Sequence, residues 1–265
     1  YFFVIALRRG LAGAALATVF GQALTLVFCI AFFMRKENRV ALSDMRPDGS
    51  VISSIIQVGI SPFGLTYLPS VTIIFMNLQA INYGGEEAVS AYAVLAYIIS
   101  FMELLVQGIG DGSQPLLSLS RGRGDEKSLK TYARWTFSLG IGVGVIGALL
   151  FLLARNLLPE FYGTSPEAGA YIIQAAPAFA LITALYGLTK PAVSYFYATR
   201  RTVRSNILVY GEIILTLVFI ILLPLFLGLD GVWYTIPAVQ VILSVLCIIF
   251  LRMPDRRRNE NERLL

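Results

Sequence analysis

The sequence predicts an all-α fold, a polytopic membrane protein whose core is a bundle of seven transmembrane helices. Hydrophobic residues make up 57% of its 265 residues, and the mean hydropathy is +0.73. Only 14% of the residues are charged, whereas a soluble domain carries about 25%. Apolar spans with almost no charge recur along the chain, and each is long enough to cross the hydrocarbon core of a bilayer. These spans cover approximately residues 10–34, 53–79, 88–118, 131–154, 167–198, 205–227 and 229–251.

Two further features concern the segment before the first span and the prolines within two later spans. The segment YFFVIAL, before the first span, resembles the end of an earlier helix, and the chain begins without a methionine, so we expect more protein upstream. Two of the spans are long enough to tilt or kink. Pro62 and Pro69 in the second span, and Pro177 and Pro191 in the fifth, remove backbone donors and can bend their helices.

Basic residues occupy every second connection between the spans. The connections at 80–87, 155–166 and 228–230 contain only Arg155 and several acids. Because this alternation follows the positive-inside rule, we expect a cell-membrane protein with its basic regions and its C-terminus in the cytoplasm. We prefer this topogenic role over a nucleic-acid or specific-lipid partner. The basic regions contain Arg35, Lys36, Arg39 and Arg46; Arg121, Arg123, Lys127, Lys130 and Arg134; Arg200, Arg201 and Arg204; and Arg252, Arg256, Arg257, Arg258 and Arg263.

Histidine is absent from the sequence. The chain therefore has no histidine general base, no histidine metal ligand and no serine–histidine triad. Its two cysteines, Cys29 and Cys247, lie in apolar spans, so a disulfide framework is not expected. We expect no metal site and no organic cofactor.

The first and last spans align without gaps when Gly10 is placed on Gly228, and Gln22 then falls on Gln240. Both spans run from the outside to the inside, as in a parallel repeat of two lobes. Such a repeat would make the chain part of a two-lobe transporter of twelve helices. On this interpretation residues 1–34 end the N-terminal lobe, 35–52 form a cytoplasmic linker, 53–251 form a six-helix C-terminal lobe, and 252–265 form a basic cytoplasmic tail.

The stretch MELLVQGIGDGSQPLLS carries four polar residues on one face of a helix: Glu103, Gln107, Asp111 and Gln114. At about 100° per residue they fall within roughly 80° of one another. Glu103 lies near the middle of its span, where an ionised carboxylate facing lipid would cost roughly 2.5–3.5 kcal/mol. We therefore expect the stripe to face the interior of the lobe. The alternative role for Glu103 is a hydrogen-bonded residue that holds helices together.

Further polar candidates lie in neighbouring spans. We expect Lys190 to pair with Asp111 or Glu212, either as a structural clamp or as a gate that opens when a carboxylate is protonated. Asn77, near the outer end of its span, is a further candidate for substrate or ion binding.

Gly108-Ile109-Gly110-Asp111 also matches the GxGD pattern of intramembrane aspartyl proteases. That chemistry requires a second aspartate close enough to share a proton. The other aspartates lie in loops, at helix ends or in the tail, so a protease remains only a remote alternative.

Three segments resemble the multidrug and toxin extrusion (MATE) family. GLAGAALATVFGQ is similar to the family's sixth helix, and QGIGDGSQPLLSLSRGRGDEKSLKTY is similar to its eighth helix and the following loop. LPLFLGLDGVW, with the segment before it, is similar to the region from the tenth to the twelfth helix. The chain departs from the family pattern at Ser120 and Arg121, where asparagine is often found, and at Gln240, where an acid is common.

The resemblance implies alternating access between two six-helix lobes, with export of a cationic or amphipathic drug-like compound as protons or sodium ions enter. The chain's partners would then be the small molecule, the bilayer and the N-terminal lobe. A flippase for lipid-linked saccharides is an alternative, but its anionic substrate would favour several basic residues in the cavity, and only Lys190 is available. A passive channel is a further alternative, which a transport assay with and without an ion gradient would distinguish.

Overall fold

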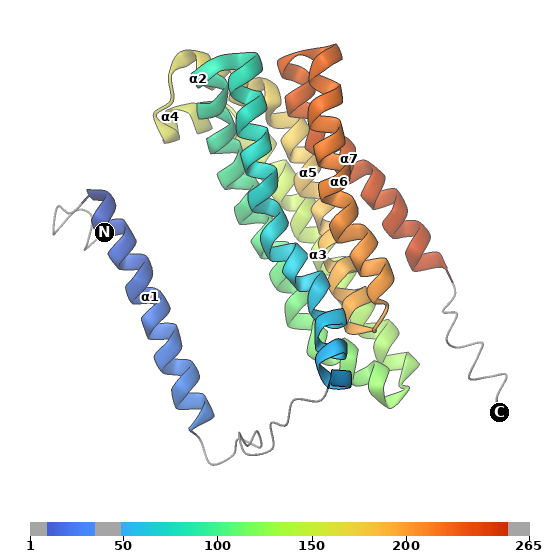
Figure 1. The fold of residues 1–265 in the computed structure, drawn as a ribbon. Helices are drawn as coiled ribbons and strands as arrows, with labels where there is room; N and C mark the ends of the chain where they lie inside the picture. The colour runs from blue at the N-terminus through green and yellow to red at the C-terminus, as the bar shows by residue number, and fades with distance from the viewer. Residues whose placement is uncertain (1–9, 35–48, 254–265) are drawn as a thin grey trace. The chain divides into compact units, whose positions relative to one another are not determined.

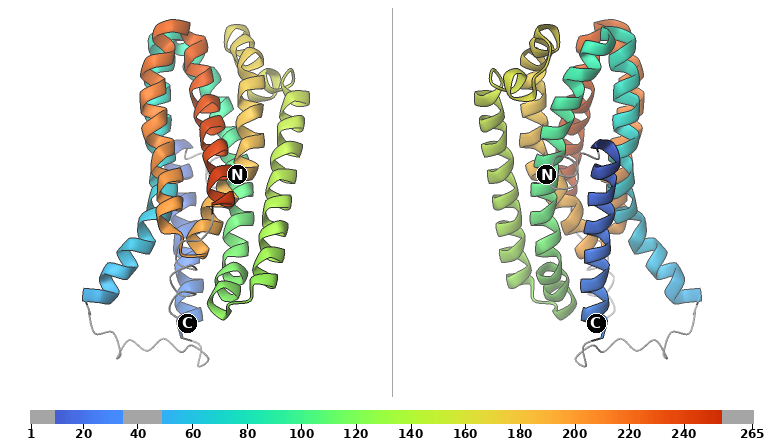
Figure 2. Two further views of the ribbon diagram at one scale, coloured as in Figure 1. Left: turned by 90° about the vertical axis from the view of Figure 1, so that its right-hand side faces the viewer. Right: turned by 90° about the vertical axis from the view of Figure 1, so that its left-hand side faces the viewer.

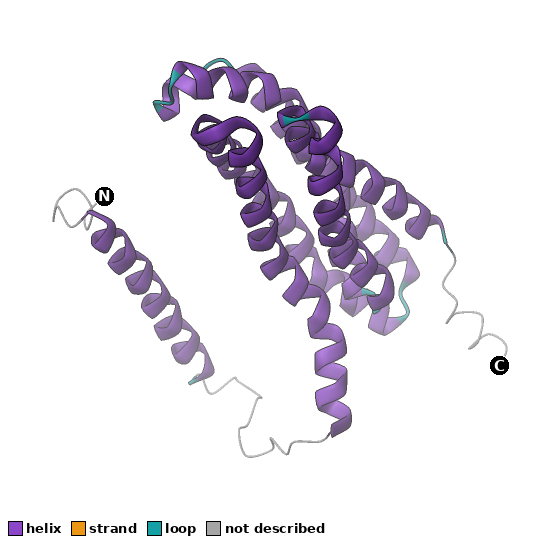
Figure 3. Cartoon of the chain, turned by 45° about the horizontal axis from the view of Figure 1, so that its top comes forward, coloured by secondary structure: helices purple, strands orange, loops and turns teal. Residues whose placement is uncertain are grey.

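The computed structural model describes residues 10–34 and 49–253. Nearly all of these residues are helical and none of them is in a strand, which confirms the all-α prediction (Figure 3). Most of the predicted linker and tail lies outside the described residues. The helices are α1 (Gly10–Phe33), α2 (Gly49–Arg123), α3 (Glu126–Ala154), α4 (Leu158–Tyr162), α5 (Pro166–Ala198), α6 (Thr202–Leu227) and α7 (Leu229–Arg252) (Figure 1).

Helix α2 consists of two limbs, 49–84 and 86–123, because the chain reverses at Gly85, and the limbs lie side by side near this turn (Figure 1, Figure 2). Gly85 has φ 69° and ψ −162°, a conformation essentially restricted to glycine. The loop predicted at 80–87 is therefore wrong, because helical structure continues up to this single residue and resumes directly after it.

Six of the described helices are long and apolar enough to cross a membrane, namely α1, α2, α3, α5, α6 and α7. Helix α2 has 75 residues. When its two limbs are counted separately, the apolar segments correspond to the seven that the sequence predicts.

The ends of the helices follow local capping. Helix α3 begins five residues before its predicted span because a carboxylate oxygen of Asp125 accepts a hydrogen bond from the Ser128 backbone N–H at 3.0 Å. Hydrogen bonds from the side chain and the backbone of Ser128 lower the pKa of Asp125. The predicted connection at 155–166 contains the short helix α4, after which Ser165 caps α5 and its hydroxyl donates to Glu87.

The chain divides into two compact units, Tyr1–Ile52 and Ser53–Leu265. The first contains α1, whose residues are exposed along most of its length. The second contains α3 to α7 and almost all of α2. The interpretation of these units as parts of two lobes stays a prediction, as does the repeat that pairs Gln22 with Gln240.

Helix α5 is the centre of the second unit. Of the membrane-spanning candidates it is the most buried, with 56% of its apolar window inside the fold, and α3, α6 and α7 all pack against it (Figure 2). Glycines permit the closest approach, since a Cβ added at Gly140 would lie 2.6 Å from the carbonyl oxygen of Gly187. The second limb of α2 approaches the same helix where Gly110 meets Ser194.

Two apolar clusters fill this unit. One gathers around Tyr92, Phe179 and Trp233, whose rings meet edge to face. The other gathers around Phe196 and Leu243. On α5, the first cluster ends at Tyr186 and the second begins at Ala192, and polar residues of α5, α6 and α7 occupy the level between them. We call this level the polar layer, and it contains Thr189, Lys190, Glu212 and Gln240.

Candidate functional site

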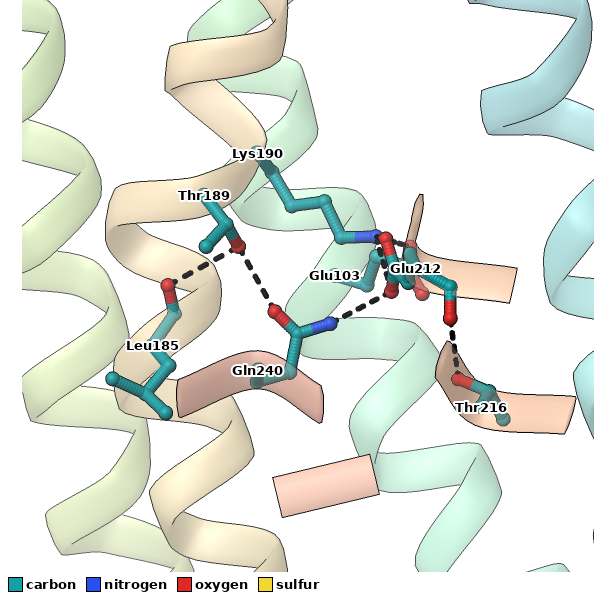
Figure 4. A network of polar contacts seen from close by, with 7 residues as sticks. All are labelled: Glu103, Leu185, Thr189, Lys190, Glu212, Thr216 and Gln240. Carbon is teal, nitrogen blue, oxygen red and sulfur yellow. Dashed lines mark hydrogen bonds and ion pairs between the residues drawn. The ribbon is translucent and has the colours of Figure 1, made fainter. Parts of the chain in front are cut away.

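Lys190 is the centre of the polar layer (Figure 4). Its side chain is only 4% exposed, and its Nζ lies 2.7 Å from Oε1 of Glu103 and 3.2 Å from Oε2 of Glu212. The three side chains come from the second limb of α2, from α5 and from α6. A single ammonium group is therefore shared by two carboxylates inside the bundle.

Uncharged side chains donate hydrogen bonds to Glu212. The amide of Gln240, a fully buried residue of α7, donates to Oε1 of Glu212 at 2.7 Å. Oε1 of Gln240 lies 3.2 Å from the hydroxyl of Thr189, and the hydroxyl of Thr216 donates to the Glu212 carbonyl at 2.7 Å (Figure 4). Gln240 thus connects α5, α6 and α7 through one side chain.

The ring of Tyr186 completes the surroundings of Lys190. Nζ lies 4.5 Å from the ring centroid, a cation–π geometry. Tyr186 is one helical turn before Lys190, in the direction in which helical side chains lean. This lean explains why the ammonium group reaches Glu103.

The charges of the layer do not balance. Two ionised carboxylates and one ammonium group carry a net charge of −1, which is unfavourable where water is largely excluded. We call Glu103, Lys190 and Glu212 the trio. One bound proton, or one monovalent cation, would bring the net charge of the trio to zero. The arrangement can therefore take up and release a single positive charge.

A cavity of about 60 Å³ lies beside the trio. It is lined by Glu103, Lys190 and Glu212, by both limbs of α2 and by apolar residues of α5, α6 and α7. A cavity holds a water molecule once it offers roughly 10–15 Å³, whereas pockets for drug-sized ligands measure roughly 300–1,000 Å³. This cavity therefore suits an ion or a few water molecules, and it is too small for a drug-like compound.

The structure supports one of the two ion pairs predicted for Lys190. It places Glu212 beside Lys190, as predicted, but Asp111 pairs elsewhere, so that alternative is wrong. Oδ1 of Asp111 accepts hydrogen bonds from Ser194 at 3.3 Å and from Gln114 at 2.8 Å. Because Lys190 leans towards the start of α5, it meets Glu103, and Asp111 lies beside Ser194, one turn further along.

The other predicted residues lie outside the network around Lys190. The expectation that the whole stripe faces the interior is wrong for Asp111, which is exposed, while Gln107 and Gln114 are half-buried. Asn77 donates to the carbonyl of Ile73 in its own helix at 3.0 Å and does not join the site. Glu103 is the member of the stripe that enters the polar layer.

Reasoning from the sequence missed Thr189, Thr216, Tyr186 and Gln240 as site residues. The two threonines have no charge, and their hydroxyl groups can simply bond to the backbone of their own helices. Tyr186 also has no charge, and an aromatic residue in an apolar span is usually part of the core. Gln240 carried a signal, since it aligns with Gln22 and stands where the family often has an acid. Within the described residues, no group of three or more His, Cys, Asp or Glu side chains could hold a metal ion.

Comparison with known proteins identifies the family. The model of the MatE family matches residues 63–225, which is more than half of the chain. The chain is 22% identical over 237 residues to the probable multidrug resistance protein NorM of Agrobacterium fabrum, covering 85% of this chain and 51% of that protein. It is also 22% identical over 259 residues to the multidrug export protein MepA of Staphylococcus aureus, covering 96% of this chain and 56% of that protein.

Its fold is similar to a solved outward-facing conformation of a multidrug resistance MATE family transporter of the MOP superfamily, with a TM-score of 0.80 at 20% identity. That match covers 95% of this chain and 58% of the other, so the chain spans about half the length of the proteins that it matches. The chain belongs to the MatE family, the multidrug and toxin extrusion transporters.

Proposed function

We propose that the chain supplies one lobe of a secondary active efflux transporter, which exports cationic or amphipathic compounds in exchange for protons or sodium ions. The observation that carries this proposal is the polar layer, in which Glu103 and Glu212 share Lys190 beside a cavity of about 60 Å³. A site that can gain or lose one positive charge at the middle of a helical bundle is what ion coupling requires.

Exchange would follow from the charge of the layer. With both carboxylates ionised, the layer attracts a cation from the outside. When a proton or sodium ion neutralises one carboxylate, that group releases Lys190, and the packing of α2, α5 and α6 around it changes. Release of the ion on the other side restores the pairs, so each transport cycle moves one coupling ion inward while the substrate moves outward.

The substrate would bind outside this cavity, since a space of about 60 Å³ excludes a drug-sized molecule. The names of the relatives, multidrug resistance protein and multidrug export protein, support a range of drug-like substrates. We propose that substrate and coupling ion are linked through the helices that carry the trio, together with an N-terminal lobe that contains α1.

The alternatives fit the site less well. A lipid-linked saccharide carries anionic phosphates, and both carboxylates of the trio already pair with Lys190, the basic residue of this cavity. An aspartyl protease needs a second aspartate beside Asp111, whose hydrogen-bond partners in the described part of the chain are Ser194 and Gln114. We therefore propose a transporter without an enzymatic activity.

The test is transport by the full-length protein in everted membrane vesicles that are energised with a proton or a sodium gradient. Glu103→Gln keeps the shape of the side chain and removes its charge, so gradient-driven drug accumulation should fall at least about tenfold at matched expression. Glu160→Gln, which removes an exposed carboxylate of α4, is the control and should transport as the wild type does. Wild-type transport by Glu103→Gln would reduce Glu103 to a packing residue, and transport without any gradient would indicate a channel.

A further inference from the structure

A second and larger hollow lies at the end of the bundle where basic residues gather. Its volume is about 680 Å³. Its walls come from the end of α2, the start of α3, the last turns of α5 and α7, and the connection before α6. Figure 2 shows the α2–α3 connection projecting beyond the ends of α5 and α7. We call it the basic pocket.

The lining of the basic pocket is strongly cationic. Five basic side chains and one carboxylate line it, so its net charge is +4. The carboxylate belongs to Glu126, which forms an ion pair with Arg121 at 3.4 Å. The basic residues come from four separate parts of the chain: Arg121, Lys130 and Arg134, Arg201, and Arg252.

The remainder of the lining is apolar. Phe137 and Tyr195 pack with their ring centroids 5.9 Å apart, and the guanidinium group of Arg201 lies 5.7 Å from the Tyr195 centroid. Ile141 continues this wall one helical turn further along α3 and is 41% exposed, as expected for a surface that faces lipid. The pocket thus joins cations at one end to an apolar wall at the other.

Direct contacts fix the far side of the pocket. Arg204 donates to the carbonyl oxygens of Phe250 at 2.8 Å and Met253 at 3.3 Å, which ties the start of α6 to the end of α7. The backbone on either side of Arg252 is therefore fixed by hydrogen bonds to α6.

Topogenic charge alone does not account for this arrangement. The positive-inside rule depends on how many Lys and Arg residues lie near the ends of the spans, and it does not require them to converge in space. Here residues as distant in sequence as Arg121 and Arg252 line one hollow that also has an apolar wall. That combination matches an amphipathic anion at the membrane surface.

We propose that the basic pocket binds the headgroup of an anionic phospholipid, with its acyl chains on the apolar surface of α3. The pocket lies on the side that the charge distribution predicts to be cytoplasmic, where anionic lipids and polybasic protein surfaces meet. The proposal is independent of the transport activity, because it rests on a hollow separate from the polar layer.

The experiment measures lipid binding to the full-length protein in neutral detergent by native mass spectrometry. The probes are dioleoyl phosphatidylglycerol and, for comparison, dioleoyl phosphatidylcholine. The pocket variant is Lys130→Gln with Arg134→Gln. The control is Arg123→Gln with Lys127→Gln, two exposed basic residues of the same connection that do not line the pocket.

The wild type should bind phosphatidylglycerol in preference to phosphatidylcholine. Each basic residue near an anionic lipid contributes a factor of about five, so the pocket variant should bind phosphatidylglycerol about 25-fold more weakly. The control should stay within about twofold of the wild type, although it loses the same charge on the same side.

Equal losses in the two variants would overturn the proposal, because they would show a diffuse effect of net charge. Full displacement of phosphatidylglycerol by inorganic phosphate would overturn it too, since the ligand would then be a soluble anion. A marked rise in lipid affinity after removal of residues 254–265 would mean that the acids of the chain's own tail occupy the pocket, which also contradicts the proposal.

Discussion

At the residue scale, Lys190 pairs with both carboxylates of the polar layer, Glu103 and Glu212. It is 4% exposed, and Glu103 and Glu212 are 13% and 24% exposed. Removing one partner from a buried ionic group leaves an uncompensated charge, which costs far more than the intact pair gains. The stability of this layer therefore depends on the sum of its charges.

We expect Lys190→Met to destabilise the protein by about 3–5 kcal/mol, because it leaves two buried carboxylates without a cation. The triple variant Lys190→Met, Glu103→Gln and Glu212→Gln should recover most of this loss, because it is neutral throughout. Thermal unfolding of the purified protein in detergent measures both effects. Lys127→Met, at an exposed position, is the control, and wild-type stability of the Lys190→Met protein would show that the carboxylates are neutral without Lys190.

The charged members of the site could be predicted from the sequence, because a charged side chain in an apolar span almost always faces the interior of the bundle rather than lipid. Glu103, Lys190 and Glu212 were all found in this way. Their pairing was only half predicted, because it depends on how far a lysine side chain leans along its helix. Gln240 was not predicted as a site residue, since an uncharged amide in an apolar helix stands out little before its neighbours are known.

At the scale of elements, α2 owes its hairpin shape to one residue. The predicted spans agree approximately with the six helices that could cross a membrane, because polar and charged residues lie near the ends of the spans. The turn at Gly85 was predicted as a loop of eight residues, since NYGGEE reads as a polar connection. The Gly84-Gly85 pair marks a turn, but composition and periodicity do not show that helical structure continues up to Gly85 on both sides.

We expect Gly85→Ala to destabilise the protein by about 1–3 kcal/mol, because φ 69° with ψ −162° is strained for a residue with a Cβ. Gly108→Ala, in the same helix, is the matched control, since a Cβ added there meets nothing within 4 Å. That change should be neutral or stabilise the helix by up to about 1 kcal/mol. Thermal unfolding of the two variants should separate them, and equal stability would show that the turn accommodates a side chain.

At the scale of the whole molecule, two features of the sequence predicted the fold class and the family. Hydropathy predicted a multi-pass bundle, and the order of the family-like segments predicted the family, because both are properties of long stretches. The interpretation of 1–34 and 53–251 as parts of two lobes stays a prediction, because it depends on how separate units sit together.

The charge distribution predicts that Glu86 and Lys127 lie on opposite sides of the membrane. Both are exposed. In a background with Cys29 and Cys247 replaced by alanine, a membrane-impermeant maleimide should label Glu86→Cys in intact cells. It should label Lys127→Cys only after the cells are permeabilised. Equal labelling of both positions in intact cells would refute the topology.

The sharing of Lys190 by two acids also constrains how the polar layer can change during evolution. Loss of the lysine first leaves two buried carboxylates unpaired, whereas loss of either acid first leaves one pair that is neutral and still hydrogen-bonded. The tolerated order of substitution therefore begins at position 103 or 212, and Lys190 is then lost together with the acid that remains. In an alignment of close relatives, a basic residue at 190 should be accompanied by at least one acid at 103 or 212, and lineages without the lysine should lack both acids.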